Sequence, residues 1–544
     1  MKFAADKYYL YEEMKELLEG WAKQYPDVLR LFSIGQSWCG REIPAAALTL
    51  GGIEEEKPGV LFDGGIHSRE FVGSSVVLYA LFYFLDNYEK DEELRKILEE
   101  KTLYFIPRIN VDGMEEDLLG KGNYRGSLKP FHEKEDGVYT TDIDGDGIII
   151  KMRIPNENGE WRCSEEDPRL LVRRMPGDTK GPFYDVFDEG LVRGEVTTPL
   201  KASKLECDRD PNREFPFDWD RKTIGENYRY SAGNYPLEDA ETRALADFII
   251  IHNNIHTIVD EHSYMSAYIS PMEFYKEKPS QPEDSMLMYE IGEAASEETG
   301  MMHANIFPLG LHGVAHGSFT PWAYFERGIA AWCCENWNIR YLYDTVNKEH
   351  PIKKMEPLMS PEEIFQTRLA LLKWDDEENG SRAFVPWHTV SHPQLGEVEV
   401  GGFQENYVIW NPPADHLEEE CKRSLKFIMR CIRAVSQLEA EEVRTEKIEQ
   451  GYRIAVKIKN KGLFSSYGTR HALEEELTTT GTWKVEVTKN GNTLKKEEKL
   501  PEIYGGCEME VSMEFPEGET GDPYTMEIRT ERAGVLYLTG TLEP

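Results

Sequence analysis

The chain has 544 residues, of which 40% are hydrophobic and 11% are aromatic, enough for a large core and a second structural unit. Its 99 acidic residues outnumber 62 lysines and arginines, which gives a formal charge of −37. A charge of this sign and size argues against binding to the phosphates of nucleic acid or to an anionic membrane surface.

The start of the chain lacks the apolar core of a secretory signal, and no apolar run of about 18 residues occurs anywhere. We therefore expect a cytoplasmic protein; the alternative is a secreted protein whose signal has been removed. The eight cysteines include no Cys-x-x-Cys pair. This usage is typical of reduced thiols that pack as small hydrophobic groups.

Apolar strands alternate with helices over most of the chain. Helices are predicted at residues 8–25, 73–88, 236–252, 284–299 and 415–438. Strands are predicted at residues 29–35, 43–50, 59–62, 102–106, 255–260 and 330–334. This alternation predicts an α/β fold with a mixed, mostly parallel sheet and helices on both faces.

Two segments depart from this alternation. Residues 128–207 are rich in turn residues and charges, and we interpret them as an insertion into a main domain of residues 1–438. Residues 439–544 contain short β-rich pieces separated by turns, which predicts a β-sandwich accessory domain of the immunoglobulin or transthyretin kind.

The sequence His67-Ser68-Arg69-Glu70 follows the strand predicted at residues 59–62. Zinc binds imidazole and carboxylate groups, and a catalytic zinc needs three protein ligands and one open position. His262 follows the strand predicted at residues 255–260 and supplies a third candidate ligand. Because open α/β sheets bind ligands beyond the carboxyl ends of their strands, His67, Glu70 and His262 are predicted to hold zinc together.

Several motifs strengthen this interpretation. The segments around residues 67, 110, 125, 212, 262 and 335 resemble, in the same order, those of zinc metallocarboxypeptidases of the pancreatic carboxypeptidase A type, also called funnelins. The resemblance covers about residues 8–435 apart from the insertion. We expect a bacterial-type member of the family with an insertion and a C-terminal β-domain. It implies a zinc-dependent enzyme that removes C-terminal residues from peptides with a free C-terminus.

The resemblance also implies roles for individual residues. Glu335 matches the general base, which takes a proton from a zinc-activated water and passes it to the leaving amine. Arg125 matches the arginine that stabilises the oxyanion. Asn212 and Arg213 match a pair that binds the α-carboxylate of the substrate, for which a planar guanidinium is well suited.

Other matches concern the substrate cleft. Tyr264 resembles a tyrosine that lines the cleft and Arg69 an arginine near it, and both are equally consistent with structural roles. His312 falls where the family has a mobile tyrosine, so it either takes over that hydrogen bonding or is incidental. Phe319 or Thr320 replaces the pocket-floor residue of the family, and both predict a preference for a neutral C-terminal side chain.

Asp142, Asp144 and Asp146 in the insertion have the spacing of a calcium loop. The distal glutamate of an EF-hand is replaced by Arg153. Calcium binding with another distal acid and a charged β-turn without an ion are both open.

Two further functions are open besides that of a carboxypeptidase. A peptidoglycan or γ-glutamyl peptide hydrolase on the same scaffold would cleave peptides with D-residues or diaminopimelate. A non-catalytic binding protein would use its β-domain for partner contacts and would lack a ligand, the base or the anchor, none of which is missing from the sequence.

Overall fold

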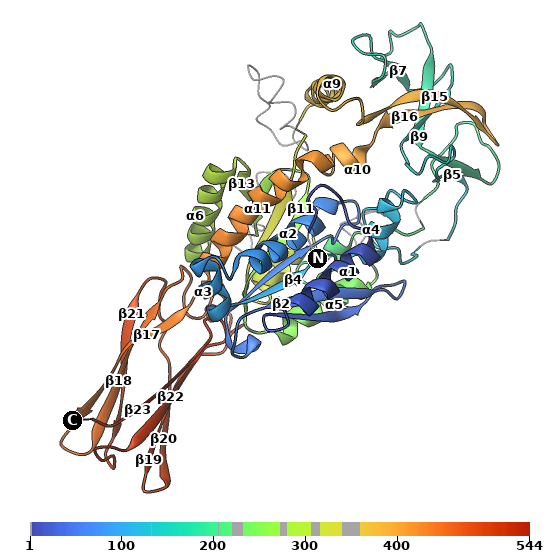
Figure 1. The fold of residues 1–544 in the computed structure, drawn as a ribbon. Helices are drawn as coiled ribbons and strands as arrows, with labels where there is room; N and C mark the ends of the chain where they lie inside the picture. The colour runs from blue at the N-terminus through green and yellow to red at the C-terminus, as the bar shows by residue number, and fades with distance from the viewer. Residues whose placement is uncertain are drawn as a thin grey trace.

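The computed structural model describes residues 3–131, 133–204, 206–219, 232–271, 280–305, 316–339 and 359–543. Three parts follow one another along an elongated molecule (Figure 1). An α/β body lies in the middle, the C-terminal strands form one end, and the strands labelled β5, β7, β9, β15 and β16 form the other.

A mixed eight-stranded sheet with the order β1-β2-β4-β3-β11-β14-β12-β13 forms the centre of the body. Its strands are β1 (Leu29–Gln36), β2 (Glu42–Leu48), β3 (Gly59–Gly64), β4 (Thr102–Ile106), β11 (Ile255–Ser263), β12 (Ala267–Ser270), β13 (Met302–Asn305) and β14 (Ala330–Asn336). The central strands β4, β3, β11 and β14 run parallel to one another. Because both faces are covered, β3, β4 and β11 are buried at every position.

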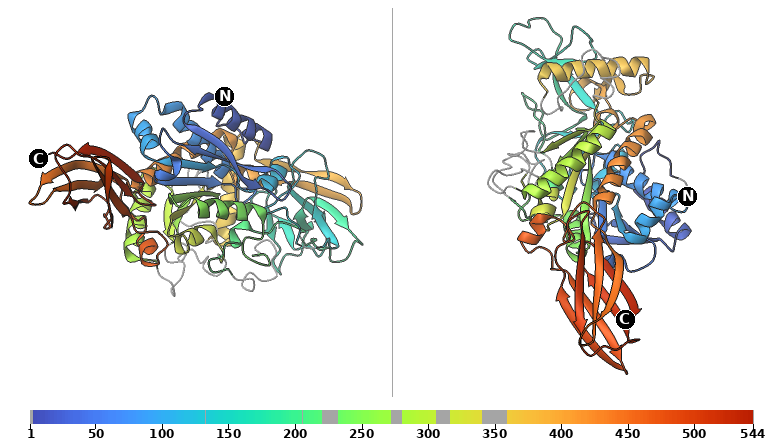
Figure 2. Two further views of the ribbon diagram at one scale, coloured as in Figure 1. Left: turned by 90° about the horizontal axis from the view of Figure 1, so that it is seen from below. Right: turned by 90° about the vertical axis from the view of Figure 1, so that its left-hand side faces the viewer.

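Helices cover both faces of this sheet (Figure 2). They are α1 (Tyr11–Gln24), α2 (Phe71–Asn87), α3 (Glu92–Glu100), α4 (Val111–Leu118), α5 (Ala240–Ile251), α6 (Pro282–Thr299), α7 (Phe319–Phe325) and α11 (Ala414–Ala434). Helix α2 is apolar almost all round because it packs between the sheet and α11. Its first residue directly follows Glu70, so this buried helix fixes the position of the predicted ligand.

The segment predicted as an insertion forms β5 (Gly137–Thr140), β6 (Lys151–Pro155), β7 (Trp161–Cys163), β8 (Leu171–Arg173), β9 (Phe183–Asp188) and β10 (Gly190–Arg193). Four of these strands join β15 (Phe384–His392) and β16 (Gly396–Phe403) in one sheet with the order β15-β16-β6-β9-β7-β8. The sheet of the insertion, here called the insertion sheet, is therefore completed by a hairpin that the sequence analysis did not predict. Helices α9 (Pro361–Glu377) and α10 (Glu405–Val408) flank that hairpin in the chain.

The C-terminal strands form two antiparallel sheets around a separate apolar core. Strands β17 (Leu438–Lys447), β18 (Tyr452–Asn460) and β21 (Glu508–Phe515) make one sheet. Strands β19 (Thr482–Lys489), β20 (Asn492–Lys499), β22 (Pro523–Arg529) and β23 (Val535–Thr541) make the other. Buried and half-buried residues alternate along β18, as expected for a strand with one face on a core.

Buried polar contacts attach these C-terminal sheets to the body. Arg532 is 2% exposed and donates to the carbonyl oxygens of Ile255 and Arg327. Thr469 Oγ1 donates to the Gly328 carbonyl oxygen over 2.9 Å. The contacts cover the starts of β11 and β14, so they lie at the opposite ends of these strands from His262 and Glu335.

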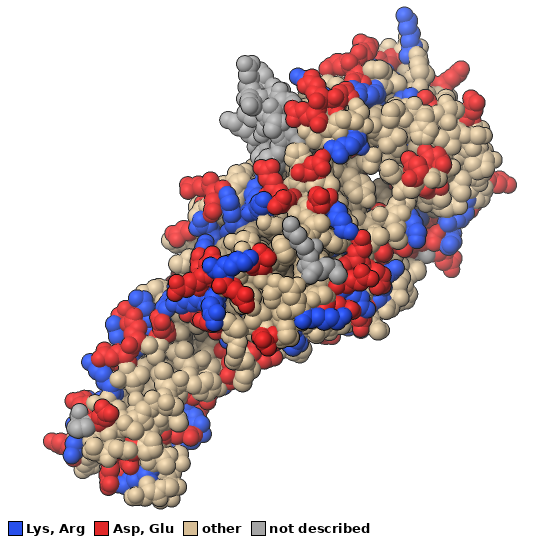
Figure 3. All heavy atoms as spheres, in the orientation of Figure 1, with Lys and Arg blue, Asp and Glu red and all other residues tan. Residues whose placement is uncertain are grey.

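The fold class predicted from the sequence is confirmed, with additional β sheets at the C-terminus. No helix in the described ranges is long and apolar enough to cross a membrane. All eight cysteines are free. Acidic and basic side chains are interspersed over the face shown in Figure 3.

Candidate metal centre and active site

Three parallel strands deliver the predicted zinc ligands and base to one edge of the sheet. His67 lies in the turn after β3, His262 lies near the end of β11, and Glu335 lies near the end of β14. In the register of β11 and β14, His262 is directly opposite Glu335. The groups lie together because parallel neighbours end at the same edge.

Close backbone packing brings Glu70 to the same place. A Cβ on Gly73, in the first turn of α2, would lie 2.3 Å from the Glu261 carbonyl oxygen, and one on Gly64 would lie 2.8 Å from the Gly73 backbone. Only residues without side chains allow α2 to start this near β3 and β11. The carboxylate of Glu70, which directly precedes α2, is thereby held against His262.

The three predicted ligands converge on one point. Glu70 Oε1 lies 2.8 Å from His67 Nδ1, Glu70 Oε2 lies 2.8 Å from His262 Nδ1, and the two Nδ1 atoms are 3.1 Å apart. All three residues are at most 2% exposed. They form one of the groups in the described ranges whose donor atoms are close enough to share a metal ion.

Two aspartates orient the imidazole rings. Asp210 Oδ1 lies 3.0 Å from His67 Nε2, and Asp260 Oδ2 lies 2.8 Å from His262 Nε2. Such carboxylate partners leave Nδ1 of each ring directed at the metal position and fix the tautomer. Neither role was predicted from the sequence, although Asp260 stands two residues before His262 on a strand and therefore shares its face.

The charges around the site favour a cation. Burial on its own raises the pKa of Glu70, but His67 and His262 hold it below its ordinary value. Burial lowers the pKa of His262, yet Asp260, Cys333 and Glu70 hold it well above its ordinary value. Two imidazole nitrogens and one carboxylate, surrounded by further acids, are a donor set that fits zinc.

Glu335 has the environment of a base. Burial, together with the nearby Glu70, raises the pKa of Glu335 to about 7. Its Oε1 lies 3.8 Å from Cys333 Sγ, and its Oε2 is buried without a hydrogen-bond partner among the described residues. A carboxylate in this state is suited to accept a proton near neutral pH.

Two segments of the chain, residues 14–146 and 189–353, match the family described as Zinc carboxypeptidase. Together they make up more than half of the chain. This chain belongs to the zinc carboxypeptidase family. The unmatched residues 147–188 between them lie within the predicted insertion.

Individual relatives of the family differ in how much of the chain they match. Carboxypeptidase B of Astacus astacus is 24% identical over 331 residues, which are 59% of this chain and 83% of that protein. The inactive metallocarboxypeptidase ECM14 of Ajellomyces dermatitidis is 33% identical over 150 residues, which are 26% of this chain and 24% of that protein. The match thus spans about a quarter of the fungal protein.

Among solved structures, bovine thrombin-activatable fibrinolysis inhibitor in complex with tick carboxypeptidase inhibitor aligns with a TM-score of 0.43 at 14% identity. The alignment covers 79% of this chain and 97% of that chain. Because relatives of this chain include proteins named inactive, family membership does not by itself decide catalytic activity.

The residue expected to stabilise the oxyanion lies beside the predicted metal ligands. Arg125 Nη1 donates to Glu70 Oε1 over 3.2 Å, and its Nε donates to Asp210 Oδ2 over 3.0 Å. Asp208 accepts hydrogen bonds from the backbone N–H groups of Arg125 and Gly126, both over 2.5 Å. The loop and the side chain are therefore both held at the edge of the site.

Asn212 and Arg213, the expected carboxylate anchor, lie beside the ligand His262 and the start of α7. Asn212 Nδ2 is 3.4 Å from His262 Nε2, and Asn212 Oδ1 accepts a hydrogen bond from Phe319 N over 2.7 Å. Arg213 Nη1 lies 3.3 Å from Ser318 Oγ. These contacts join the anchor pair to the start of α7, the segment that resembles the family's specificity segment.

The remaining expected cleft residues are placed as follows. Tyr264 packs against Trp410 with ring centroids 4.2 Å apart, and Arg69 lies over the same Trp410 ring at 4.9 Å. Phe319 is fully buried against Phe215, with ring centroids 4.9 Å apart. The predictions for His312 lie outside the described residues.

The aspartate loop of the insertion is explained without an ion. Asp142 accepts hydrogen bonds from Gly145 N over 2.6 Å and Gly147 N over 2.9 Å. Asp144 pairs with His388 Nε2 over 2.9 Å, and Asp146 accepts from a backbone N–H two residues later. The three carboxylates lie close together. Their oxygens already accept hydrogen bonds from the turn or pair with His388, so calcium binding is not supported.

Proposed function

We propose that this chain is a zinc-dependent metallocarboxypeptidase that hydrolyses the C-terminal peptide bond of peptides. The observation that carries the proposal is the convergence of His67 Nδ1, His262 Nδ1 and the Glu70 carboxylate within 2.8 to 3.1 Å, with Glu335 opposite His262. The family supports zinc as the metal and a peptide as the substrate.

His67, Glu70 and His262 would hold the zinc ion. When bound, zinc supplies a Lewis acid that polarises a carbonyl and lowers the pKa of a water molecule. Asp210 and Asp260 keep both imidazoles in the ligating orientation. The buried ligands lose little freedom on binding because their rotamers are already fixed by these contacts.

Glu335 would serve as general base and then as general acid. Its raised pKa, about 7, places its protonation change near neutral pH, where both roles are efficient. It would accept the proton of the attacking water and return it to the leaving amine. The pairing of β11 with β14 places it directly across from His262.

Arg125, Asn212 and Arg213 would bind the substrate. Arg125 lies 3.2 Å from the ligand Glu70, which suits stabilisation of negative charge on the carbonyl oxygen. Arg213, joined to Asn212 and to the start of α7, would bind the free α-carboxylate. That requirement for a free carboxylate restricts cleavage to the last peptide bond.

The test is release of C-terminal residues from a peptide library that contains free and amidated C-termini, D-residues and diaminopimelate stems. Zinc content is measured on the same samples by elemental analysis. We expect the wild type to bind about one zinc per chain and to trim only free C-termini. Glu335→Gln is expected to retain zinc and to lose activity by about two to four orders of magnitude.

A matched control is Glu377→Gln, which alters an exposed acid on α9 and should leave activity unchanged. Cleavage of diaminopimelate stems alone would assign the chain to peptidoglycan chemistry. Full zinc content without any cleavage would support a binding protein, a result that the inactive fungal relatives make worth testing.

A further inference from the structure

A cavity of about 310 Å³ lies where the insertion sheet meets the α/β body. Its walls come from the loop after α4, the start of β6, the end of β9 and the segment from β16 into α10. In Figure 3 the surface opens between these two parts of the molecule. Its volume is at the lower end of the range for small-molecule sites, about 300 to 1,000 Å³.

Most of this cavity is specific to this chain rather than to the family. Residues 147–151, Asp188 and residues 403–407 contribute most of its wall, and all lie outside the ranges that match the family. The insertion and the α/β body are in close backbone contact at this cavity. A Cβ on Gly120 would lie 1.7 Å from the Gly147 carbonyl oxygen. Gly120 also has a φ of +66°, so both its conformation and its contact require glycine.

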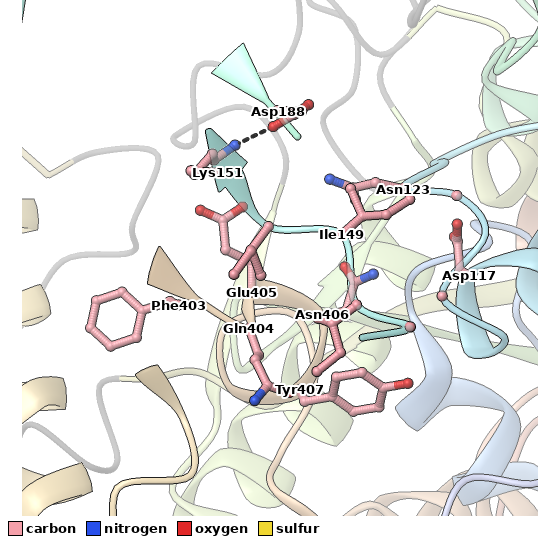
Figure 4. Close-up of a pocket in the computed structure, with 15 residues that line it drawn as sticks. Asp117, Asn123, Ile149, Lys151, Asp188, Phe403, Gln404, Glu405, Asn406 and Tyr407 are labelled. Atoms are coloured by element: carbon pink, nitrogen blue, oxygen red, sulfur yellow. Dashed lines mark hydrogen bonds and ion pairs between the residues drawn. The ribbon is translucent and has the colours of Figure 1, made fainter. Parts of the chain in front are cut away.

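Three carboxyl groups and one lysine line the cavity, those of Asp117, Asp188 and Glu405 and that of Lys151 (Figure 4). Lys151 Nζ forms an ion pair with Asp188 Oδ1 over 2.5 Å. Burial lowers the pKa of Lys151, but the charges of Glu405 and Asp188 hold it above its ordinary value. The carboxylate of Glu405 forms no hydrogen bond or close ion pair among the described residues, but its charge acts on the nearby Lys151 ammonium. The amide oxygen Oδ1 of Asn406 is likewise buried without a donor among those residues.

One of these carboxyl groups lies at the far side of the cavity. Asp117 is 2% exposed, and its Oδ1 accepts a hydrogen bond from Tyr124 N over 2.8 Å. Its Oδ2 has no hydrogen-bond partner among the described residues. Buried acceptors without donors are costly, and a ligand that donates hydrogen bonds relieves this cost.

The aromatic rings of Phe403 and Tyr407 and the side chain of Ile149 complete the wall (Figure 4). We propose that this cavity binds an organic ammonium group, carried either by a peptide or by a free amine. Glu405 and the Asn406 amide oxygen would accept hydrogen bonds from the ammonium, and the buried Oδ2 of Asp117 would accept another. Aromatic and aliphatic walls would contact the carbon chain that carries the ammonium.

The cavity is connected with the active site through one loop. Asn123 lines the cavity, and its carbonyl oxygen accepts a hydrogen bond from Arg69 Nη2 over 3.0 Å. Arg69 Nε also donates to the Tyr124 carbonyl oxygen over 2.9 Å, and Arg125 follows directly. A ligand in the cavity would therefore contact the loop that positions Arg125.

The test is isothermal titration of the full-length, zinc-loaded protein with 1,5-diaminopentane, and with glutarate as a probe of the same length and opposite charge. We expect the diamine to bind and glutarate not to bind. Glu405→Gln and Asp117→Asn should each weaken diamine binding at least tenfold. Lys151→Met should tighten it, because the cation that acts on Glu405 is then removed.

The matched control is Glu397→Gln, which alters an exposed acid on β16 and should leave binding unchanged. Thermal unfolding of each variant checks that it is folded. The proposal is overturned if the diamine does not bind, or if glutarate binds as well as the diamine. If Glu405→Gln leaves diamine binding unchanged and removal of zinc abolishes it, the amine binds at the metal, and this outcome also overturns the proposal.

Competition between peptides and the diamine for the Glu335→Gln variant determines whether the ammonium belongs to a peptide or to a free amine. If a peptide with a free N-terminus displaces the diamine and its acetylated form does not, the ammonium belongs to the peptide. If neither peptide displaces it, the site is one for a free amine. Since binding is measured without turnover, the outcome is independent of whether the chain is an active carboxypeptidase.

Discussion

Removal of the Arg532 guanidinium is expected to destabilise the protein without changing its active site. Arg532 lies between β22 and β23 and is 2% exposed. Its two terminal nitrogens donate to the carbonyl oxygens of Ile255 and Arg327, where β11 and β14 begin. Although burial lowers its pKa to about 10, Arg532 is still charged at neutral pH.

The magnitude follows from the two carbonyl groups. In Arg532→Ala both lose their donor while the C-terminal sheets still exclude water from them. A buried polar group without a partner costs about 1 to 3 kcal/mol, so the pair costs about 2 to 6 kcal/mol. Loss of the packed arginine stem adds to this cost.

The assay is thermal and urea unfolding followed by tryptophan fluorescence, with zinc content and peptide cleavage measured on the same samples. The control is Arg444→Ala, which removes an arginine that is 54% exposed on β17 and pairs with Glu510. We expect a much larger loss of stability for Arg532→Ala than for the control. Equal losses would refute the reasoning that Arg532 anchors the C-terminal sheets to the body.

Three further predictions follow. Burial raises the pKa of Glu241 to about 7 from its ordinary value of 4.5, so the stability that it contributes at low pH is lost as pH rises through about 7. Glu241→Gln keeps the acceptor for Trp38 N and should remove up to about 3 kcal/mol of this loss. The free energy of unfolding of the wild type and the variant is measured from pH 4 to 9, and the same pH dependence in both would contradict the prediction. Asp260→Asn should weaken zinc binding about 10- to 100-fold in competition with a chelator, because His262 Nε2 loses a charged partner, and unchanged affinity would count against this role. Millimolar calcium should leave the Tm unchanged, because Asp142 already accepts two backbone hydrogen bonds, and a rise in Tm that disappears in Asp144→Asn would show that an ion binds.

Local patterns predicted the elements of the body well. The strand expected at 102–106 is β4 (Thr102–Ile106), and the helix expected at 284–299 is α6 (Pro282–Thr299). Such elements have long apolar runs or clear periodicity, since they are buried between layers. Strand β15 (Phe384–His392), by contrast, is buried only at its two ends, has half-buried or exposed residues between them, and was not predicted.

The candidate site was predictable to the extent that it sits at the ends of strands. His67, His262 and Glu335 each follow or end an apolar run, and this position is visible in the sequence. Asp210 carries no such signal, because its contact with His67 joins residues far apart in the chain. Its role depends on where Asp210 lies against the turn after β3.

The sequence by itself determined the α/β class, the strand-end position of His67, His262 and Glu335 and the presence of β-rich C-terminal strands. These features depend on burial and periodicity, which each segment encodes locally. Only the tertiary structure decided that β15 and β16 complete the insertion sheet, that Arg532 contacts the starts of β11 and β14, and that a cavity lies beside the Arg125 loop. Each of these depends on contacts between distant segments, and the packing of the whole chain selects them.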